Sequence, residues 1–226
     1  MNPLDRPVWQ TLTHAHKALS TGDDRARRFI SDVNKFVSGP DDAPETMQRV
    51  AQLLGPGEEA YILQVEGIEI PQGLIALKQA QGVQMVFERD RPPAYDPDGI
   101  DPLGADDAAD MLALASLTEP GPFLPRTHEM GDFFGVRIEG RLAAMAGTRM
   151  RFPGYCEVSG VCTHPDFQGR GLAKRLSAHV ARHILERGER PFLHAWASNE
   201  MAIGLYKRLG FAIRCHVNAA IVERPS

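Results

Sequence analysis

The stretch between Glu157 and Ala173 limits most strongly how this chain can fold. Its first part, Glu157–Thr163, has the composition of a buried strand, and a turn with two glycines follows. A helical pattern then runs over Leu172–Arg187 and is stopped by Gly188. A strand that passes through a short turn into a helix is typical of sheets covered by helices. This segment therefore predicts an α/β fold.

The remainder of the second half alternates in the same way. Two strands are predicted on either side of a short hairpin turn at Glu139-Gly140-Arg141. The expected elements are the strands Phe133–Ile138, Leu142–Met150 and Pro191–Ala197, the helices Asp106–Leu117 and Glu200–Leu209, and a final hairpin or strand pair over Phe211–Glu223. Strands that alternate with helices indicate a mixed α/β architecture.

The clearest break in the sequence lies at Asp90–Gly104, where four prolines and two glycines indicate an extended connector. We therefore expect an N-terminal α/β region at 1–90, a Pro-rich connector at 91–103 and a second domain at 104–226. The first region carries no catalytic signature. Its expected elements are the helices Pro7–Leu19 and Ala43–Leu54 and the strands Glu59–Glu66 and Gly82–Glu88.

Charge and cysteine content exclude several classes of protein. The 226 residues include 25 Lys and Arg against 29 Asp and Glu, and this net charge of −4 argues against broad nucleic-acid binding. Apolar runs stay below the roughly 18 residues of a membrane span, and the first residues lack the pattern of a secretory signal. Three cysteines without a CxxC spacing indicate reduced thiols. We expect a cytoplasmic protein without a membrane partner, of unknown oligomeric state.

The turn before Leu172 is a candidate site for a phosphate anion. Free N–H groups and the positive dipole end at the start of a helix attract anions. Gly169 and Gly171 allow close approach of the backbone, and Lys174 and Arg175 add positive charge. The alternative is an ordinary tight turn. The motif of a P-loop and the full dinucleotide fingerprint are both missing from this segment.

Two motifs in sequence resemble those of a known superfamily. Residues 168–173 read Gln-x-x-Gly-x-Ala, and residues 199–211 read Asn-x-x-Ala-x-x-x-Tyr-x-x-x-Gly-Phe. Both are similar to the coenzyme A motifs of the GNAT superfamily of N-acetyltransferases. The resemblance covers residues 104–226 and is greatest to the FR47-like branch, which is related to glycine N-acyltransferases. It implies a mixed, mostly antiparallel central sheet flanked by helices, and residues 1–90 are a candidate degenerate half-copy of that fold.

The resemblance also implies an activity. The chain would move an acetyl group from acetyl-CoA to a primary amine, carried by a small molecule or a peptide, by direct attack of the amine. No metal is expected. A longer acyl-CoA donor and a non-catalytic regulatory module that binds coenzyme A remain alternatives.

Specific roles follow from matching the motifs residue by residue. The resemblance implies that the pantetheine arm pairs with the backbone of Val161, Cys162 and Thr163. It implies that the pyrophosphate is held by the loop of Gln168, Gly169, Arg170, Gly171, Leu172 and Ala173. Asn199 would bind pantetheine or cap the helix that follows. Tyr206 is the candidate acid for the departing thiolate. A thiol is the stronger acid, so a hydrogen bond from Tyr206 is the more economical description.

Glu157 is the candidate base, because it stands eleven positions before Gln168 like the strand carboxylate of histone acetyltransferases. Strict alternation would place it on one strand face with Ser159, Val161 and Thr163. An ammonium and a carboxylate differ by about six pKa units. Glu157 would therefore need a raised pKa, a water relay or an amine that arrives neutral. The alternative is a surface carboxylate at the start of a strand.

Other reactive side chains are interpreted as structural. Cys162 has no base beside it in the sequence, so buried packing is favoured over an acyl-cysteine route. His179 and His183 have the i, i+4 spacing of a metal pair, but the HExxH motif is missing from the sequence. Glu119 and Arg126, in a loop rich in proline and glycine, are candidates to line an amine pocket.

Overall fold

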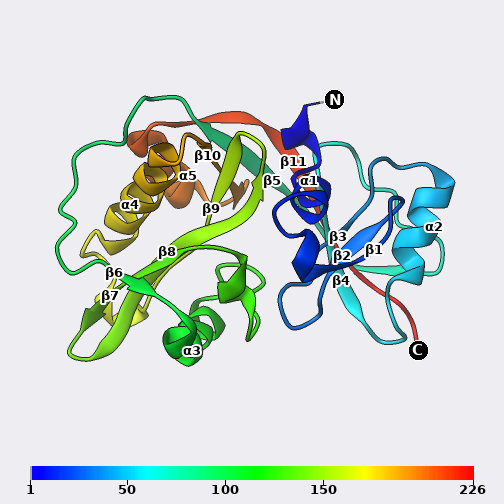
Figure 1. The fold of residues 1–226 in the computed structure, drawn as a ribbon, viewed down its shortest axis with the longest axis horizontal. Coiled ribbons are helices and arrows are strands. Elements are labelled where there is room, and N and C mark those ends of the chain that lie inside the picture. The colour runs from blue at the N-terminus through cyan, green and yellow to red at the C-terminus, as the bar shows by residue number, and fades with distance from the viewer. Residues whose placement is uncertain (1) are drawn as a thin grey trace.

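The computed structural model describes residues 2–226 and is built on one eight-stranded sheet (Figure 1). The strand order is β4-β11-β5-β10-β9-β8-β7-β6, and every neighbouring pair is antiparallel except β9 and β10. The predicted mixed, mostly antiparallel sheet is therefore confirmed. Its strands are β4 Glu59–Gln64, β5 Ile75–Phe87, β6 Asp101–Leu103, β7 Phe133–Ile138, β8 Arg141–Phe152, β9 Tyr155–Thr163, β10 Arg190–Trp196 and β11 Phe211–Glu223.

Helices cover both faces of this sheet. The helices α4 (Leu172–Glu186) and α5 (Glu200–Leu209) share one core with β8, β9 and β10. The helices α1 (Pro7–Thr13) and α3 (Ala108–Thr118) pack on the other face of the sheet through two separate clusters. The helix α2 (Pro44–Gln52) lies at the end of the molecule remote from α4 (Figure 1). Short 3-10 helices occupy Pro3–Asp5, Lys17–Leu19, Ala105–Asp107, Thr127–Met130 and Pro165–Phe167. Within residues 2–226, no helix is long and apolar enough to cross a bilayer.

Helix α4 forms because its apolar residues recur every three to four positions. Leu172, Leu176, Val180 and Ile184 are all at most 5% exposed and face the sheet. The opposite side carries Arg182 and Glu186, an exposed i, i+4 ion pair. The helix therefore has a fixed orientation on β8 and β9, and this fixes where its first turn points.

The parallel pair β9 and β10 stays together only at its start. The register joins Arg190 to Tyr155 and ends with Phe192 opposite Glu157. Beyond that point both strands continue, β9 as far as Thr163 and β10 as far as Trp196, without pairing to each other. The two strands thus diverge, and the side of β9 that faces away from β8 is left without a strand partner.

A bulge in β9 corrects the expected alternation of its side chains. Gly160 has φ 62°, and the pairing of β8 with β9 shifts register on both sides of Ser159. Val161 packs into the cluster under α4, whereas Cys162 packs into the cluster under α3. Ser159 lines a cavity beside Phe123 and Phe133 of the cluster under α3, so it faces the side opposite to Val161, which a strict period of two could not predict.

Residues before the connector belong to the same sheet as those after it. Strand β5 lies between β10 and β11, and β4 forms the edge beside β11. A second, three-stranded sheet consists of β1 Ser20–Gly22, β2 Arg27–Phe29 and β3 Val37–Ser38. The division into domains near residue 90 stays a prediction, and hydrogen bonds of the large sheet cross that boundary.

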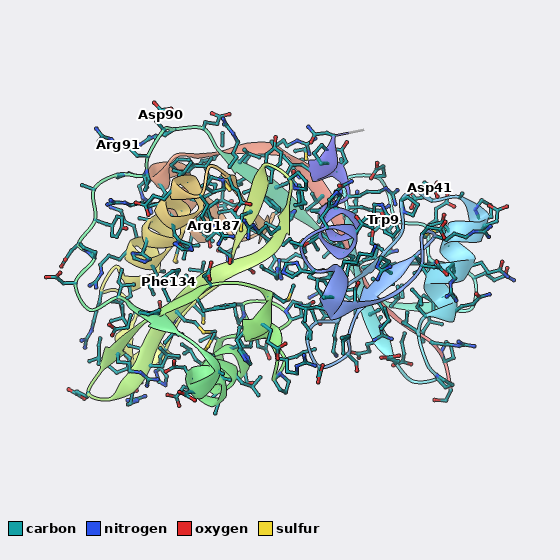
Figure 2. All side chains as sticks on the ribbon, in the orientation of Figure 1. Trp9, Asp41, Asp90, Arg91, Phe134 and Arg187 are labelled. Atoms are coloured by element: carbon teal, nitrogen blue, oxygen red, sulfur yellow. The ribbon has the colours of Figure 1, made fainter. Side chains whose placement is uncertain are left out.

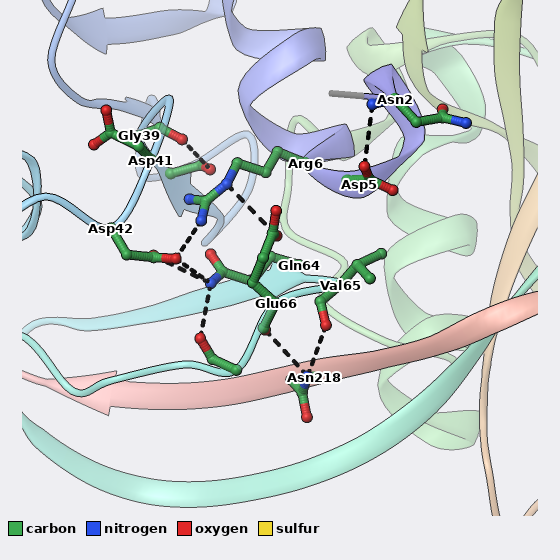
Figure 3. A network of polar contacts seen from close by, with 12 residues as sticks. Asn2, Asp5, Arg6, Gly39, Asp41, Asp42, Gln64, Val65, Glu66 and Asn218 are labelled. Atoms are coloured by element: carbon green, nitrogen blue, oxygen red, sulfur yellow. Dashed lines mark hydrogen bonds and ion pairs between the residues drawn. The ribbon is translucent and has the colours of Figure 1, made fainter.

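A buried arginine, Arg6, joins the start of the chain to the loop before α2 and to the end of β4 (Figure 3). Arg6 is 3% exposed, donates to Asp42 and lies 3.6 Å from Glu66. Gln64 donates to the same Asp42 carboxylate, and Asn218 of β11 donates to the carbonyl of Glu66 at 3.1 Å. These contacts join the chain start, the loop before α2, β4 and β11 in one polar cluster.

Some expected elements differ from the observed ones. Phe211–Glu223 is one strand and not a hairpin, because two register shifts let it follow both β4 and β5. The first helix ends at Thr13, since His16 turns inward and its ring bonds Thr11 and the carbonyl of Met130. Strand β5 begins at Ile75 instead of Gly82, because its exposed first half pairs with β11 and has no apolar alternation.

Candidate functional site

The turn before α4 leaves backbone donors free. Gly169 and Gly171 have φ 76° and 74°, and within 4 Å of a Cβ built on either there is no other atom. The N-cap position, Gly171, provides no side-chain hydrogen bond to the helix. The first backbone bond of α4 runs from the N–H of Arg175 to Gly171, so the N–H groups of the first turn lack an intrahelical acceptor. These donors and the helix dipole can bind an anion.

Cationic side chains surround this turn. Lys174 is exposed, and Arg170 lies over the ring of Phe167, with its guanidinium carbon 5.4 Å from the ring centroid. Arg175 donates to the carbonyl of Asp98 in the connector. A cavity of about 140 Å³ lies between the connector and the start of α4, with Tyr95 and Lys174 among its lining residues. The turn therefore has positive charge and space beside it.

Two predicted site residues of the second motif belong to α5: Asn199 lies at its N-cap and Tyr206 within the helix. Asn199 accepts a hydrogen bond from the N–H of Ala202 at 3.0 Å, so the helix-cap alternative is what the structure shows. Tyr206 packs against Phe211, with the ring centroids 6.0 Å apart. Its hydroxyl makes no hydrogen bond with any residue between 2 and 226, and burial raises the pKa of Tyr206 to about 12. The phenol stays neutral and able to donate.

The unpaired side of β9 carries the predicted pantetheine contacts. Cys162 is buried under α3, and burial raises the pKa of its thiol to about 11. A thiol in that state is a poor nucleophile. The hydroxyl of Thr163 is buried without a hydrogen-bond partner among the described residues. The pantetheine contacts of these residues stay a prediction.

Glu157 is fully buried in an ionic cluster. Its two oxygens accept hydrogen bonds from Nε and Nη2 of Arg149, both at 2.8 Å, and from Nδ1 of His194 at 2.8 Å. Burial alone would raise the pKa of Glu157, but the charge and hydrogen bonds of Arg149, with those of His194, lower it to about 2. A raised pKa, one of the three routes to a base, is therefore contradicted, as is the surface carboxylate.

This cluster continues across the sheet. Nε2 of His194 lies 3.1 Å from the amide nitrogen of Gln84, which also donates to the carbonyl of Leu4. The amide oxygen of Gln84 accepts from Arg214, which in turn pairs with Asp5. Because the carboxylate of Glu157 can only accept, Nδ1 of His194 carries a proton in this contact. Sequence reasoning missed this cluster, because its members come from five strands and the N-terminal 3-10 helix and share no motif.

A small cavity opens on the opposite side of β9 from α4. It has a volume of about 10 Å³ and is lined by Pro120, Gly121, Pro122, Phe123, Thr127, Phe133, Arg149, Ser159 and Gly160. N-terminal residues hold one wall of the cavity in place. The hydroxyl of Thr127 donates to the carbonyl of Val33 at 2.6 Å, and the N–H of Arg126 donates to the carbonyl of Asp32 at 3.0 Å. Arg126 pairs with Glu129 and Asp32, and neither it nor Glu119 lines the cavity.

The histidines of α4 have separate partners. Nδ1 of His179 lies 3.2 Å from the hydroxyl of Tyr95, and Nε2 of His183 lies 2.9 Å from Asp132. The stretch from residue 2 to residue 226 contains no group of three or more His, Cys, Asp or Glu placed to hold a metal ion. Figure 2 shows Arg187, which also pairs with Asp132, on the same side of the molecule as Phe134.

Comparison with known proteins agrees with this geometry. The model of the FR47-like protein family matches residues 134–219. A solved structure from Novosphingobium aromaticivorans DSM 12444, assigned to the GNAT family of acetyltransferases, is 41% identical over 100% of both chains with a TM-score of 0.93. A GCN5-related N-acetyltransferase from Kribbella flavida shares the fold, with a TM-score of 0.66 at 16% identity over 100% of this chain and 97% of that one.

Curated relatives match over a shorter stretch. A mycothiol acetyltransferase from Saccharomonospora viridis is 37% identical over 90 residues, which are 36% of this chain and 29% of the relative. The match to the mycothiol acetyltransferase of Paenarthrobacter aurescens is 33% identical over 87 residues, 36% of this chain and 27% of that protein. The aligned stretch thus spans less than a third of each curated relative. On the full-length match above, this chain belongs to the GNAT family of acetyltransferases.

Proposed function

We propose that this chain is an N-acetyltransferase that moves the acetyl group of acetyl-CoA to a primary amine by direct attack. The observation that carries the proposal is the uncapped, glycine-bearing first turn of α4 beside the unpaired side of β9. A diphosphate and an extended amide arm need these two features next to each other. The match to a GNAT-family structure over the whole chain supports the same assignment.

The donor is bound by backbone groups in this proposal. The residues fit it, because the N–H groups from Gly169 to Ala173 surround a turn that no side chain caps. The backbone of Val161, Cys162 and Thr163 pairs with the amides of the pantetheine arm. When bound, acetyl-CoA supplies the activated thioester. Asn199 contributes by capping α5, which fixes the position of Tyr206 on that helix.

Tyr206 provides a hydrogen bond to the departing sulfur. Its pKa of about 12 keeps the hydroxyl neutral at physiological pH, and it is not engaged by any residue in the described part of the chain. A neutral donor placed where negative charge develops stabilises the transition state without giving up its proton.

In this proposal Glu157 is not the base that takes the proton of the amine. A carboxylate with a pKa of about 2 that already accepts from Arg149 and His194 has little basicity left. We assign Glu157 to holding these two side chains in place. The amine then attacks in its neutral form or loses its proton through water. The acceptor is a small-molecule or peptide amine that approaches on the side of β9 where the small cavity lies.

Calorimetry and a thiol-release assay test the proposal. We expect the purified protein to bind acetyl-CoA and to bind S-acetylpantetheine, which lacks the diphosphate, at least 10-fold more weakly. We expect thiol release with at least one member of a panel of primary amines. Absence of any heat with acetyl-CoA would overturn the proposal. Tight binding without thiol release across the panel would favour the non-catalytic module, and preference for longer thioesters would favour the longer donor.

We also propose a cytoplasmic location, because the three cysteines Cys156, Cys162 and Cys215 are all free thiols.

A further inference from the structure

One nitrogen of Arg149 is left over from the buried ionic cluster. Nε and Nη2 both donate to Glu157, whereas Nη1 makes no hydrogen bond with any residue of 2–226. The side chain is only 11% exposed. A guanidinium carries five N–H donors, and those on Nη1 are not used by the fold. The unused donor is therefore available to a ligand.

This free nitrogen belongs to the small cavity beside β9. Arg149 is one of the cavity's lining residues, and Nη1 is the atom nearest to a Cβ built on Gly121, at 3.8 Å. The other walls are mostly the rings of Phe123 and Phe133 and two prolines. At about 10 Å³ the cavity holds one small group, about the size of a water molecule. No carboxylate lines it, so it suits an oxygen acceptor and not an ammonium group.

The position of the donor is fixed by its surroundings. The guanidinium donates two parallel hydrogen bonds to Glu157, and its carbon lies 5.1 Å from the ring centroid of Phe36. His194 and the N–H of Met150 in turn hold the carboxylate. The charge of Arg149 is balanced by Glu157, so an uncharged carbonyl and a carboxylate can both accept from Nη1. A fixed donor loses little entropy on binding.

The cavity is next to the strand that would hold the thioester. Ser159 and Gly160 line it, and they directly precede Val161 on β9. An oxygen seated on Nη1 therefore places the atoms bonded to it close to the unpaired side of β9. On the basis of the proposed function, we infer that Arg149 selects acceptors with a carbonyl oxygen adjacent to the amine-bearing carbon, as in α-amino amides and α-amino carboxylates.

Matched substrates and a conservative variant test this inference. L-Alaninamide and sec-butylamine share the amine-bearing carbon and differ in the carbonyl group. We expect the ratio of their kcat/KM values to fall by about 10- to 100-fold in Arg149→Lys relative to wild type, the effect of one hydrogen bond from a charged donor. Differences in intrinsic reactivity of the two amines cancel in this comparison. Arg182→Lys, an exposed arginine paired with Glu186, should leave the ratio unchanged.

The possible outcomes are separable. Thiol release that is absent with every amine overturns the proposed function together with this inference. Wild-type turnover with an unchanged ratio in Arg149→Lys, or turnover restricted to amines without a neighbouring carbonyl, overturns the inference alone. If Arg149→Lys does not fold, the double variant Arg149→Gln with Glu157→Gln removes both charges. The same fall in the ratio is expected there, and an unchanged ratio contradicts the inference.

Discussion

Glu157 is buried and Tyr206 is partly buried, and their environments shift the two pKa values in opposite directions. The carboxylate has three side-chain donors within 2.8 Å, so its charged form is favoured inside the protein. The phenol has no partner, and burial alone raises its pKa to about 12. In both cases the protein moves the pKa further away from 7, so each group keeps the protonation state that the free side chain has at neutral pH. Neither is poised to exchange a proton there, which favours roles in hydrogen bonding over proton transfer.

Glu157 should make the stability of the fold depend on acidity. Because its pKa falls from the usual 4.5 to about 2 on folding, its stabilising effect is complete above about pH 4.5 and is lost as the pH falls toward 2. Glu157→Gln should be destabilised by about 3–5 kcal/mol at pH 7, since Arg149 loses its partner. The variant should also lose less stability than wild type between pH 4.5 and 2, where other carboxyl groups with a lowered pKa, such as Asp132, still contribute.

Urea unfolding of both proteins between pH 7 and pH 3 measures this. Glu186→Gln, which removes half of an exposed ion pair, is the matched control and should behave like wild type to within about 1 kcal/mol. Equal acid sensitivity in Glu157→Gln and wild type would contradict the prediction.

Tyr206 should affect turnover and leave binding nearly unchanged. Tyr206→Phe removes a hydroxyl that bonds no described residue, so we expect a fold of near-normal stability and kcat lowered by about 10- to 100-fold. Calorimetry with acetyl-CoA should give a Kd within about 3-fold of wild type, an energy change well below that of one charged hydrogen bond. An unchanged kcat would remove Tyr206 from the reaction. Because its pKa is about 12, the rate should show no loss from tyrosine ionisation below pH 10.

Among the helices and strands, those whose two ends are both marked by residues in the sequence were predictable. Helix α5 has the observed bounds Glu200–Leu209, because Asn199 and Gly210 mark its two ends. The glycine turn before α4 was equally clear. The bulge at Gly160 was not, since a glycine within a strand has the same sequence signal whether or not the register shifts. That bulge decides which residues of β9 face the small cavity, so the lining of this cavity could not be predicted from the sequence.

The connector is anchored to α4 by side chains. The hydroxyl of Tyr95 lies 3.2 Å from Nδ1 of His179, and Arg175 bonds the carbonyl of Asp98. Tyr95→Phe should therefore speed amide hydrogen exchange in residues 90–100 while costing less than about 1.5 kcal/mol of global stability. Tyr155→Phe is the matched control, because no hydrogen bond joins the Tyr155 hydroxyl to any residue in 2–226. Exchange in the connector that stays at the wild-type rate would contradict the prediction.

At the scale of the whole molecule, the two halves of the chain share one sheet. Strand β5 pairs with β10 from Gly82 to Val86 and with β11 along nearly its full length. A fragment of residues 104–226 would expose the edges of both strands and the apolar residues that β5 covers. We expect this fragment to aggregate or to lack a cooperative thermal transition by circular dichroism. A soluble fragment that unfolds cooperatively and binds acetyl-CoA would show an autonomous domain.

The relation between the halves could not be predicted from sequence. Pairs such as Ala60 with Val222 are separated by most of the chain, and no local pattern encodes such partners. The cluster around Glu157 has the same origin, because Gln84 and His194 meet it only when β5 and β10 are neighbours. Local signals therefore gave the residues proposed to bind the donor, which lie in two short motifs of the second half of the chain. They could not give the cluster around Glu157 and Arg149, which is assembled across the sheet.

Residues 32–36 contact the wall of the small cavity, so sequence changes in this stretch alter the cavity during evolution. Phe36 lies under Arg149, and the carbonyls of Asp32 and Val33 hold the loop at Arg126 and Thr127. Substitutions in this short N-terminal stretch would tilt the guanidinium or move the loop while leaving the glycine turn and α5 untouched. With the roles proposed above, acceptor preference can thus drift between descendants of one ancestor while their common donor is retained.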